Sequence, residues 1–138
     1  MLSGKRILIF IVLLFICLQT LNVFAEETID FLELCKKGSY EEIQAALKEG
    51  ADPNQTGPDG VTPLMYAARY NPNPSVLILL RNYGAYLNSR DKNGESALFY
   101  ALHNSNPIVL NTLISMGANV NVLNKSGKNA LFKAVEAE

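Results

Sequence analysis

The side chains that most often carry chemistry in proteins are sparse in this sequence. It contains one histidine, His103, and two cysteines, Cys17 and Cys35. A nucleophile needs a base within hydrogen-bond reach, and the residues around His103 supply no such pair. A metal site needs ligands at characteristic spacings, and one histidine with scattered carboxylates does not provide them. We therefore expect no catalytic residue, no metal site, no cofactor and no enzyme; the alternative is an activity built on His103 and nearby carboxylates.

The glycines follow a period instead of forming a phosphate-binding loop. Gly60, Gly94 and Gly127 are separated by 34 and 33 residues. Each opens a similar stretch: Gly-Val-Thr-Pro-Leu-Met-Tyr-Ala-Ala, Gly-Glu-Ser-Ala-Leu-Phe-Tyr-Ala-Leu and Gly-Lys-Asn-Ala-Leu-Phe-Lys-Ala-Val. A fixed period of this size is typical of stacked repeat proteins. The sequence therefore predicts a repeat array, with positive φ at these three glycines.

The N-terminus has the pattern of a secretory signal. Lys5 and Arg6 precede an apolar run at 7–18, and Val-Phe-Ala ends at Ala25 before two glutamates. This pattern predicts a signal peptide, residues 1–25, that is cleaved after Ala25. The alternative is an inner-membrane anchor formed by residues 7–24. A membrane span needs about 20 apolar residues, and polar residues interrupt this segment after residue 18. We therefore expect an exported protein, periplasmic or secreted, at residues 26–138.

The charge of the exported chain limits its partners. Removing Lys5 and Arg6 from the 12 basic residues leaves 10 against 13 acidic ones, a net charge of −3. This balance argues against nucleic-acid binding, which depends on Lys and Arg neutralising phosphates. Cys35 would be the one remaining cysteine, so it cannot form an internal disulfide. We expect the protein to be a monomer. We also expect it to contact no membrane, unless the signal segment stays uncleaved.

After residue 25, helical segments alternate with turns. Thr28, Ser39 and Ser96 are expected N-caps, and Thr62-Pro63 is a good helix start. Proline disfavours helix at the residue before it, so Asn71-Pro72-Asn73-Pro74 is expected to interrupt the helix. The first expected helix ends at Lys37. The others are expected at residues 40–49, 64–70, 75–83, 97–104, 108–116 and 129–136.

The order of helix, turn, helix, Gly-Ala and extended loop resembles the ankyrin repeat. The closing half is carried by Gly50-Ala51-Asp52-Pro53-Asn54, Gly84-Ala85-Tyr86-Leu87-Asn88 and Gly117-Ala118-Asn119-Val120-Asn121. The opening half is carried by Thr62-Pro63-Leu64 and Asp91-Lys92-Asn93-Gly94. The resemblance implies an all-α solenoid of stacked helix-turn-helix pairs with extended hairpin-like loops. Its units are expected at about 28–56, 57–90 and 91–123, with a partial one at 124–138.

The sequence departs from the family pattern in several places. The family's histidine after Pro-Leu is replaced by Met65, Phe99 and Phe132, which we interpret as packing residues, as we do Cys35. The second unit has one extra residue, which we place in its inter-helix turn, 71–74. The last unit has only a first helix, whose outer face is expected to be partly exposed. That face could be a cap, a partner surface or the mark of a truncation.

The resemblance also implies a function, which is binding a protein partner without catalysis. In this family, loop tips and the ends of first helices contact partners. Aromatic, amide and charged side chains at the matching positions suit a protein surface. The candidate contact residues are Asp59, Val61, Arg69, Tyr70, Lys92, Asn93, Glu95, His103, Asn104, Lys125 and Lys128.

Overall fold

The computed structural model describes residues 8, 9, 11–13 and 30–136. The chain divides into two units, Met1–Asp30 and Phe31–Glu138. In the first unit, residues 8, 9 and 11–13 are helical and exposed. The expected cleavage after Ala25 and the expected Thr28 cap lie outside the described residues. No helix in the described ranges has the length and apolar character that crossing a membrane requires.

The described residues of the second unit form helices joined by turns and loops, with no strand among them. Its elements are α2 (Phe31–Lys37), α3 (Tyr40–Lys48), the short 3-10 turn η1 (Pro58–Gly60), α4 (Pro63–Tyr70), α5 (Ser75–Asn82), α6 (Ala97–Ala101), α7 (Pro107–Ser115) and α8 (Ala130–Glu136). The expected all-α architecture is thus confirmed.

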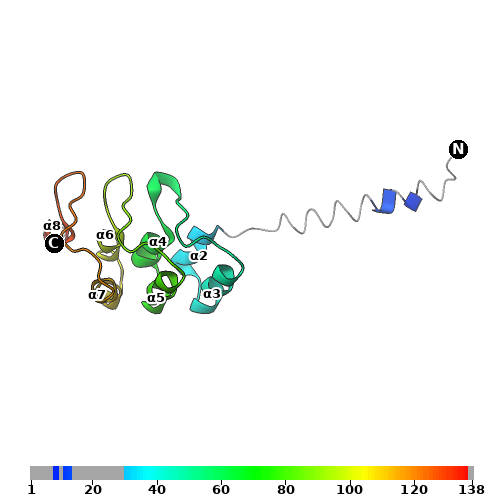
Figure 1. The fold of residues 1–138 in the computed structure, drawn as a ribbon, viewed down its shortest axis with the longest axis horizontal. Coiled ribbons are helices and arrows are strands. Elements are labelled where there is room, and N and C mark those ends of the chain that lie inside the picture. Colours follow the sequence, from blue (N-terminus) through cyan, green and yellow to red (C-terminus); the bar gives the residue numbers. More distant parts are fainter. Residues whose placement is uncertain (1–7, 10, 14–29, 137–138) are drawn as a thin grey trace. The chain divides into compact units, whose positions relative to one another are not determined.

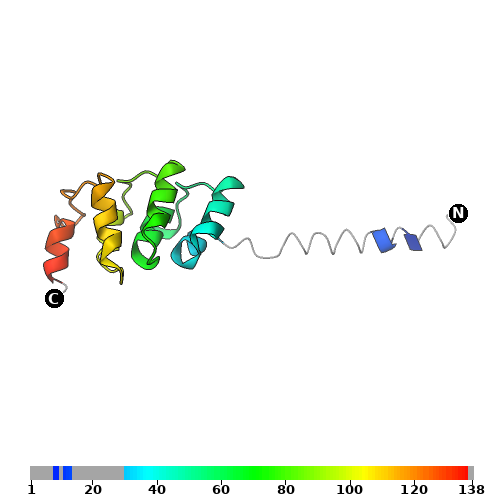
Figure 2. The ribbon, with the colours of Figure 1, turned by 90° about the horizontal axis from the view of Figure 1, so that it is seen from below.

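The helices of this unit form two rows. Helices α2, α4, α6 and α8 make one row, while α3, α5 and α7 make the other (Figure 1). Helix α4 packs on α2 and α6 within its own row and on α5 in the other row. Figure 2 shows successive helices lying side by side from the cyan end of the unit to the red end. Hairpin-like loops extend beyond the first row, one before each of α4, α6 and α8.

Local sequence explains most of the helix starts. Ser39 Oγ accepts the Glu42 amide at 3.2 Å, and Glu42 Oε2 accepts the Ser39 amide at 2.8 Å, which forms a capping box. Thr62 caps α4 through the Met65 amide, as expected. Ser96 does not cap α6 with its side chain. The Phe99 amide, which a cap would take, donates to the Ser96 carbonyl at 2.9 Å instead.

Helix α6 is shorter than the expected 97–104. The amides of Leu102, His103 and Asn104 bond three residues back, so the chain tightens after Ala101. The Asn71 amide instead bonds four residues back, to Ala67, and α4 runs on to Tyr70. The extra residue of the second repeat is therefore absorbed at the end of α4, and its placement in the inter-helix turn was wrong.

The core lies between the two rows of helices. Cys35, Ala67, Val76, Leu80 and Leu113 are buried there, which confirms Cys35 as a packing residue. Met65 and Phe99 are also buried, as expected for the residues that replace the family's histidine. Phe132, at the same repeat position on α8, is exposed. Its expected packing role was wrong, because no further helix among the described residues packs on that side of α8 and only Lys128 Nζ lies over the ring, 5.2 Å from its centroid.

The loops are joined to one another by backbone bonds. The Lys92 amide donates to the Asp59 carbonyl, and the Lys125 amide donates to the Asn93 carbonyl, both at 2.8 Å. Gly60, Gly94 and Gly127 have φ between 74° and 77°, as expected for these turns. A Cβ on Gly94 would lie 3.3 Å from the Lys125 nitrogen, so this glycine also permits the close approach of the next loop. The loop tips are therefore joined to one another by hydrogen bonds in a single row.

Candidate partner-binding surface

A compact group of aromatic and basic side chains lies on the first row of helices. Tyr66 and Tyr70, one helical turn apart on α4, stack with their ring centroids 6.3 Å apart. Lys36 Nζ, from α2, lies 4.9 Å from the Tyr66 centroid and 5.4 Å from that of Tyr70. The Arg69 guanidinium carbon lies 5.2 Å from the Tyr70 centroid. These four residues, Lys36, Tyr66, Arg69 and Tyr70, are called the tyrosine cluster below.

The tyrosine cluster combines a solvent-exposed ring, that of Tyr70, with contacts that hold this ring in one orientation. Tyr70 is 50% exposed although its ring is stacked on Tyr66 and flanked by two cations. Lys36 also pairs with Glu33 at 2.8 Å. This hydrogen bond raises the pKa of Lys36 and, together with that from Lys37, lowers the pKa of Glu33. A half-exposed tyrosine that is already ordered loses little side-chain entropy when a partner covers it.

Tyr100 fixes the base of the neighbouring loop to α6. Its hydroxyl donates to Asp91 Oδ2 at 2.7 Å. Asp91 Oδ1 accepts the amides of Asn93 and Glu95, both at 2.8 Å. Burial, the hydrogen bond to Asp91 and the charge of Asp91 raise the pKa of Tyr100 well above its ordinary value, while the charge of Arg69 opposes them. The phenol is therefore a donor that holds Asp91, and its raised pKa does not suit it to act as a base near neutral pH.

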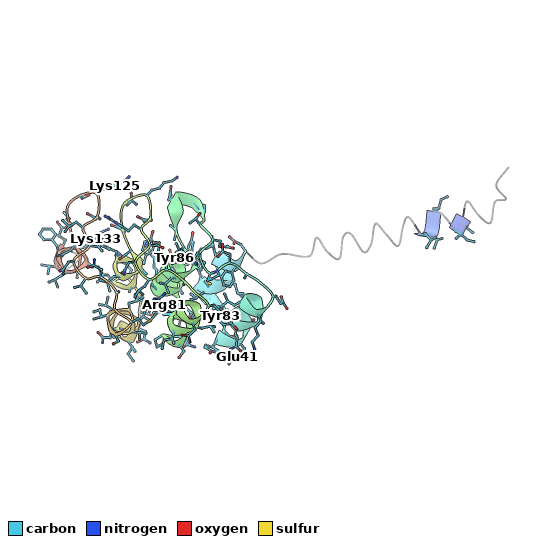
Figure 3. The ribbon with its side chains drawn as sticks, in the orientation of Figure 1. Glu41, Arg81, Tyr83, Tyr86, Lys125 and Lys133 are labelled. Atoms are coloured by element: carbon cyan, nitrogen blue, oxygen red, sulfur yellow. The ribbon has the colours of Figure 1, made fainter. Side chains whose placement is uncertain are left out.

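The candidate residues of the loop tips are brought together. Lys92 Nζ lies 3.3 Å from Asp59 Oδ1, in an exposed ion pair between adjacent tips. Asp59 has φ 61°, a left-handed conformation that aspartate tolerates better than most residues. Asn93 and Lys125 are exposed beside this pair, and Figure 3 shows Lys125 at the outer end of its loop. The loop tips, which hydrogen bonds join into one row, thus carry both acidic and basic side chains.

The ends of the first helices hold the second group of candidates. Arg69 and Tyr70 end α4, and His103 follows α6 on the surface. Lys36, Arg69 and His103 follow one another at one repeat interval, 33 and 34 residues. Among the described residues, no group of three histidine, cysteine, aspartate or glutamate side chains is arranged to hold a metal ion.

Besides the exposed Asp59–Lys92 pair, four candidates are engaged within the chain itself. Val61 is buried in the core. Asn104 Nδ2 donates to the carbonyls of Ala68 and Asn71. Glu95 pairs with Lys133 of α8, and Lys128 pairs with Glu136. Val61 has almost no surface for a partner, and the other three join parts of the stack, so they are left out of the binding surface proposed below.

Sequence reasoning missed Lys36, Tyr66 and Asn71. The signal for Lys36 was its separation of one period from Arg69, which places two cations at equivalent positions of adjacent helices. The signal for Asn71 was the match between Asn71-Pro72-Asn73-Pro74 and Asn104-Ser105-Asn106-Pro107. Neither signal reveals which side chain covers which ring.

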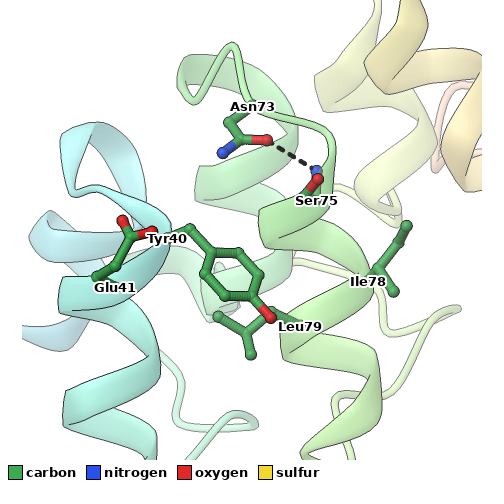
Figure 4. Close-up of a pocket in the computed structure, with 6 residues that line it drawn as sticks. All are labelled: Tyr40, Glu41, Asn73, Ser75, Ile78 and Leu79. Carbon is green, nitrogen blue, oxygen red and sulfur yellow. Dashed lines mark hydrogen bonds between the residues drawn. The ribbon is translucent and has the colours of Figure 1, made fainter.

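A shallow cavity of about 490 Å³ lies on the second row, between α3 and α5. Figure 4 shows Tyr40 of α3 reaching toward Leu79 of α5, with Asn73 and Ser75 above them. The Ser75 amide donates to Asn73 Oδ1 at 3.0 Å. Glu41 is the one charged residue in the lining, which contains no nucleophile with a base. The cavity therefore offers contact surface and no catalytic arrangement.

Comparison with protein-family models agrees with the two-row stack. A model described as ankyrin repeats (many copies) matches residues 46–101, and one described as ankyrin repeat matches residues 93–125. Together they span residues 46–125, which is 80 of the 138 residues. No curated protein matches the chain. Ankyrin repeats generally mediate protein–protein binding as non-catalytic scaffolds. With its repeat period, paired helices and tied loops, the chain belongs to the ankyrin-repeat family.

Proposed function

We propose that the chain is an exported, non-catalytic module that binds one protein partner through the first row of helices. The tyrosine cluster forms the centre of this surface. His103 and the loop-tip residues Asp59, Lys92, Asn93 and Lys125 flank it. The partner is a folded protein or a peptide, and the surface needs no cofactor to hold it.

The observation that carries this proposal is the state of Tyr70. Half of its surface is open to solvent, while Tyr66, Lys36 and Arg69 fix the ring from the other sides. Tyrosine and arginine are among the residues that contribute most to protein interfaces. The ordered ring carries apolar area and a hydroxyl, and the adjacent cations favour a partner that brings acidic or carbonyl groups.

The test is capture of the partner from the native compartment by wild-type and substituted chains. We expect the triple variant Arg69→Ala, Tyr70→Ala, His103→Ala to lose a partner that the wild type retains, with its circular dichroism unchanged. The matched control is Glu41→Ala, Lys48→Ala, Tyr83→Ala, which changes exposed residues of the second row and its ends. The control should retain the partner. Equal capture by both variants would refute the binding surface.

Export is tested separately, by N-terminal sequencing of the protein from its native host. The basic start, the apolar run and the Val-Phe-Ala site support cleavage. A mature chain that begins at Glu26 is the expected result. An intact N-terminus in the membrane fraction would instead favour the alternative, a membrane-anchored interaction module that retains residues 7–24.

A further inference from the structure

The guanidinium of Arg69 is used differently from those of the other two arginines that the structure describes. Arg81 and Arg90 both donate to backbone carbonyls of their own chain, at 3.1 and 3.0 Å. Among the described residues, the exposed Arg69 guanidinium lies beside the Tyr70 ring but donates no hydrogen bond and forms no ion pair. Its N–H donors therefore remain available to a molecule that binds at this surface.

A second cation lies beside the same ring. The Arg69 guanidinium carbon and Lys36 Nζ are both within 5.4 Å of the Tyr70 ring centroid. The first belongs to α4 and the second to α2, so the packing of these two helices brings the cations together. A planar guanidinium can bind a carboxylate through two parallel N–H···O bonds, which an ammonium group cannot do. Arg69 is therefore suited to a directed contact, and Lys36 adds positive charge next to it.

The charge at the ends of α2 and α4 is opposite in sign to that of the whole chain after residue 25. Lys36, Lys37 and Arg69 carry three positive charges, and Glu33, which pairs with both lysines, carries one negative charge. The local excess is two positive charges, whereas residues 26–138 together carry a net charge of −3. A local field of this kind attracts acidic groups of a partner and disfavours basic ones.

The carboxylate of Asp91, in the loop before α6, is engaged elsewhere. It is buried, its Oδ2 accepts the Tyr100 hydroxyl, and its Oδ1 accepts two backbone amides. Tyr100 is close enough to Arg69 for the charge of Arg69 to act on its phenol. His103 lies three residues beyond Tyr100 and is exposed, so the polar surface continues from α4 to the end of α6. The Asp91 carboxylate thus shapes its own loop and is not an ion-pair partner of Arg69.

We propose that this surface binds an acidic segment of a protein, with one carboxylate on the Arg69 guanidinium and a second near Lys36. The inference rests on the proposed partner-binding surface and adds the chemistry of the partner. Tyr70 covers the apolar part of the segment between the two carboxylates, and His103 contacts the segment where it crosses α6. A neutral or basic segment would exclude water from Arg69 without supplying an acceptor, which is costly for a charged group.

The test is an NMR titration of the isotope-labelled full chain with a synthetic glycine–serine peptide that carries several glutamates. The control peptide carries glutamine at the same positions. We expect the acidic peptide to shift the amide signals of α2 and α4, and the glutamine peptide to leave them in place.

Three variants show which cation is responsible. Arg69→Ala should weaken binding of the acidic peptide roughly tenfold, the value of one charged hydrogen-bonded contact. Lys48→Ala removes the same charge from an exposed position of α3 and should change the affinity by less than about twofold, because salt screens distant charges. Arg69→Lys keeps the charge but loses the paired hydrogen bonds, so its affinity should fall between these two.

Each result of the titration decides the proposal. Equal binding of the two peptides, or no binding by the wild type at millimolar peptide, would overturn it. Equal effects of Arg69→Ala and Lys48→Ala would also overturn it, because the attraction would then depend on overall charge.

The capture experiment separates this inference from the proposed function. If the variant Arg69→Ala, Tyr70→Ala, His103→Ala loses its partner while the acidic peptide does not bind the wild type, the binding surface stands and only its acidic chemistry is refuted. If the peptide binds as expected but that variant keeps the partner, the proposed function is refuted and the carboxylate site at Arg69 remains.

Discussion

Asn71 and Asn104 hold the same place in successive repeats, and each bridges back to the repeat before it. Asn71 Nδ2 donates to the carbonyls of Cys35 and Gly38, at 3.3 and 3.0 Å. Asn104 Nδ2 donates to the carbonyls of Ala68 and Asn71, both at 2.9 Å. Each side-chain oxygen accepts the amide two residues further along. One side chain thus supports the end of one helix and shapes the turn that follows another.

Replacing Asn71 with alanine should therefore weaken the stack. The substitution removes the Asn71 donor from the buried carbonyl of Cys35 and the part-buried carbonyl of Gly38, which we expect to cost about 1–3 kcal/mol. Urea denaturation measures the loss. Asn111→Ala, at an exposed position of α7, should change the free energy of unfolding by less than about 0.5 kcal/mol. Equal effects of the two substitutions would contradict the bridging role.

The repeat position shared by Leu64 and Leu131 gives a matched pair of substitutions. Leu64→Ala removes a fully buried side chain and should lower the free energy of unfolding by about 2–5 kcal/mol. Leu131→Ala changes an exposed side chain and should cost less than about 0.5 kcal/mol when measured at low protein concentration. Denaturant unfolding of both variants checks the difference. A large loss for Leu131→Ala under these conditions would show that α8 is covered within a single chain.

The contact between Tyr100 and Asp91 predicts a loss of stability in alkali. Burial and the Asp91 carboxylate raise the pKa of Tyr100 above its ordinary value of 10.0. Above about pH 10 the unfolded chain releases this proton while the folded protein retains it. The contribution of Tyr100 is therefore complete below that pH and is lost as the pH rises toward the folded pKa. The free energy of unfolding should fall more steeply above pH 10 in the wild type than in Tyr100→Phe. Parallel slopes would contradict the shift.

The sequence determined the repeat and most of the helix boundaries because these depend on short-range chemistry. Glycines recur where φ must be positive, and Ser39 and Thr62 occur where an amide needs a capping oxygen. A period of 33 or 34 residues can be recognised in a single sequence, and it predicted a repeat array. The resemblance to the ankyrin repeat implied the stacked helix pairs. Cys35, Met65 and Phe99 were correctly predicted to be packing residues on the same basis.

Only the tertiary structure decided what each repeated position contacts. Phe99 and Phe132 share a position, yet one is buried and the other exposed, because burial depends on whether another element lies over the helix. Val61 and Asn104 looked free in the sequence but are used inside the stack. Lys36 and Tyr70 lie far apart in the chain and meet through the packing of α2 on α4. Periodicity reports equivalent positions, whereas contacts between repeats arise only when the helices stack.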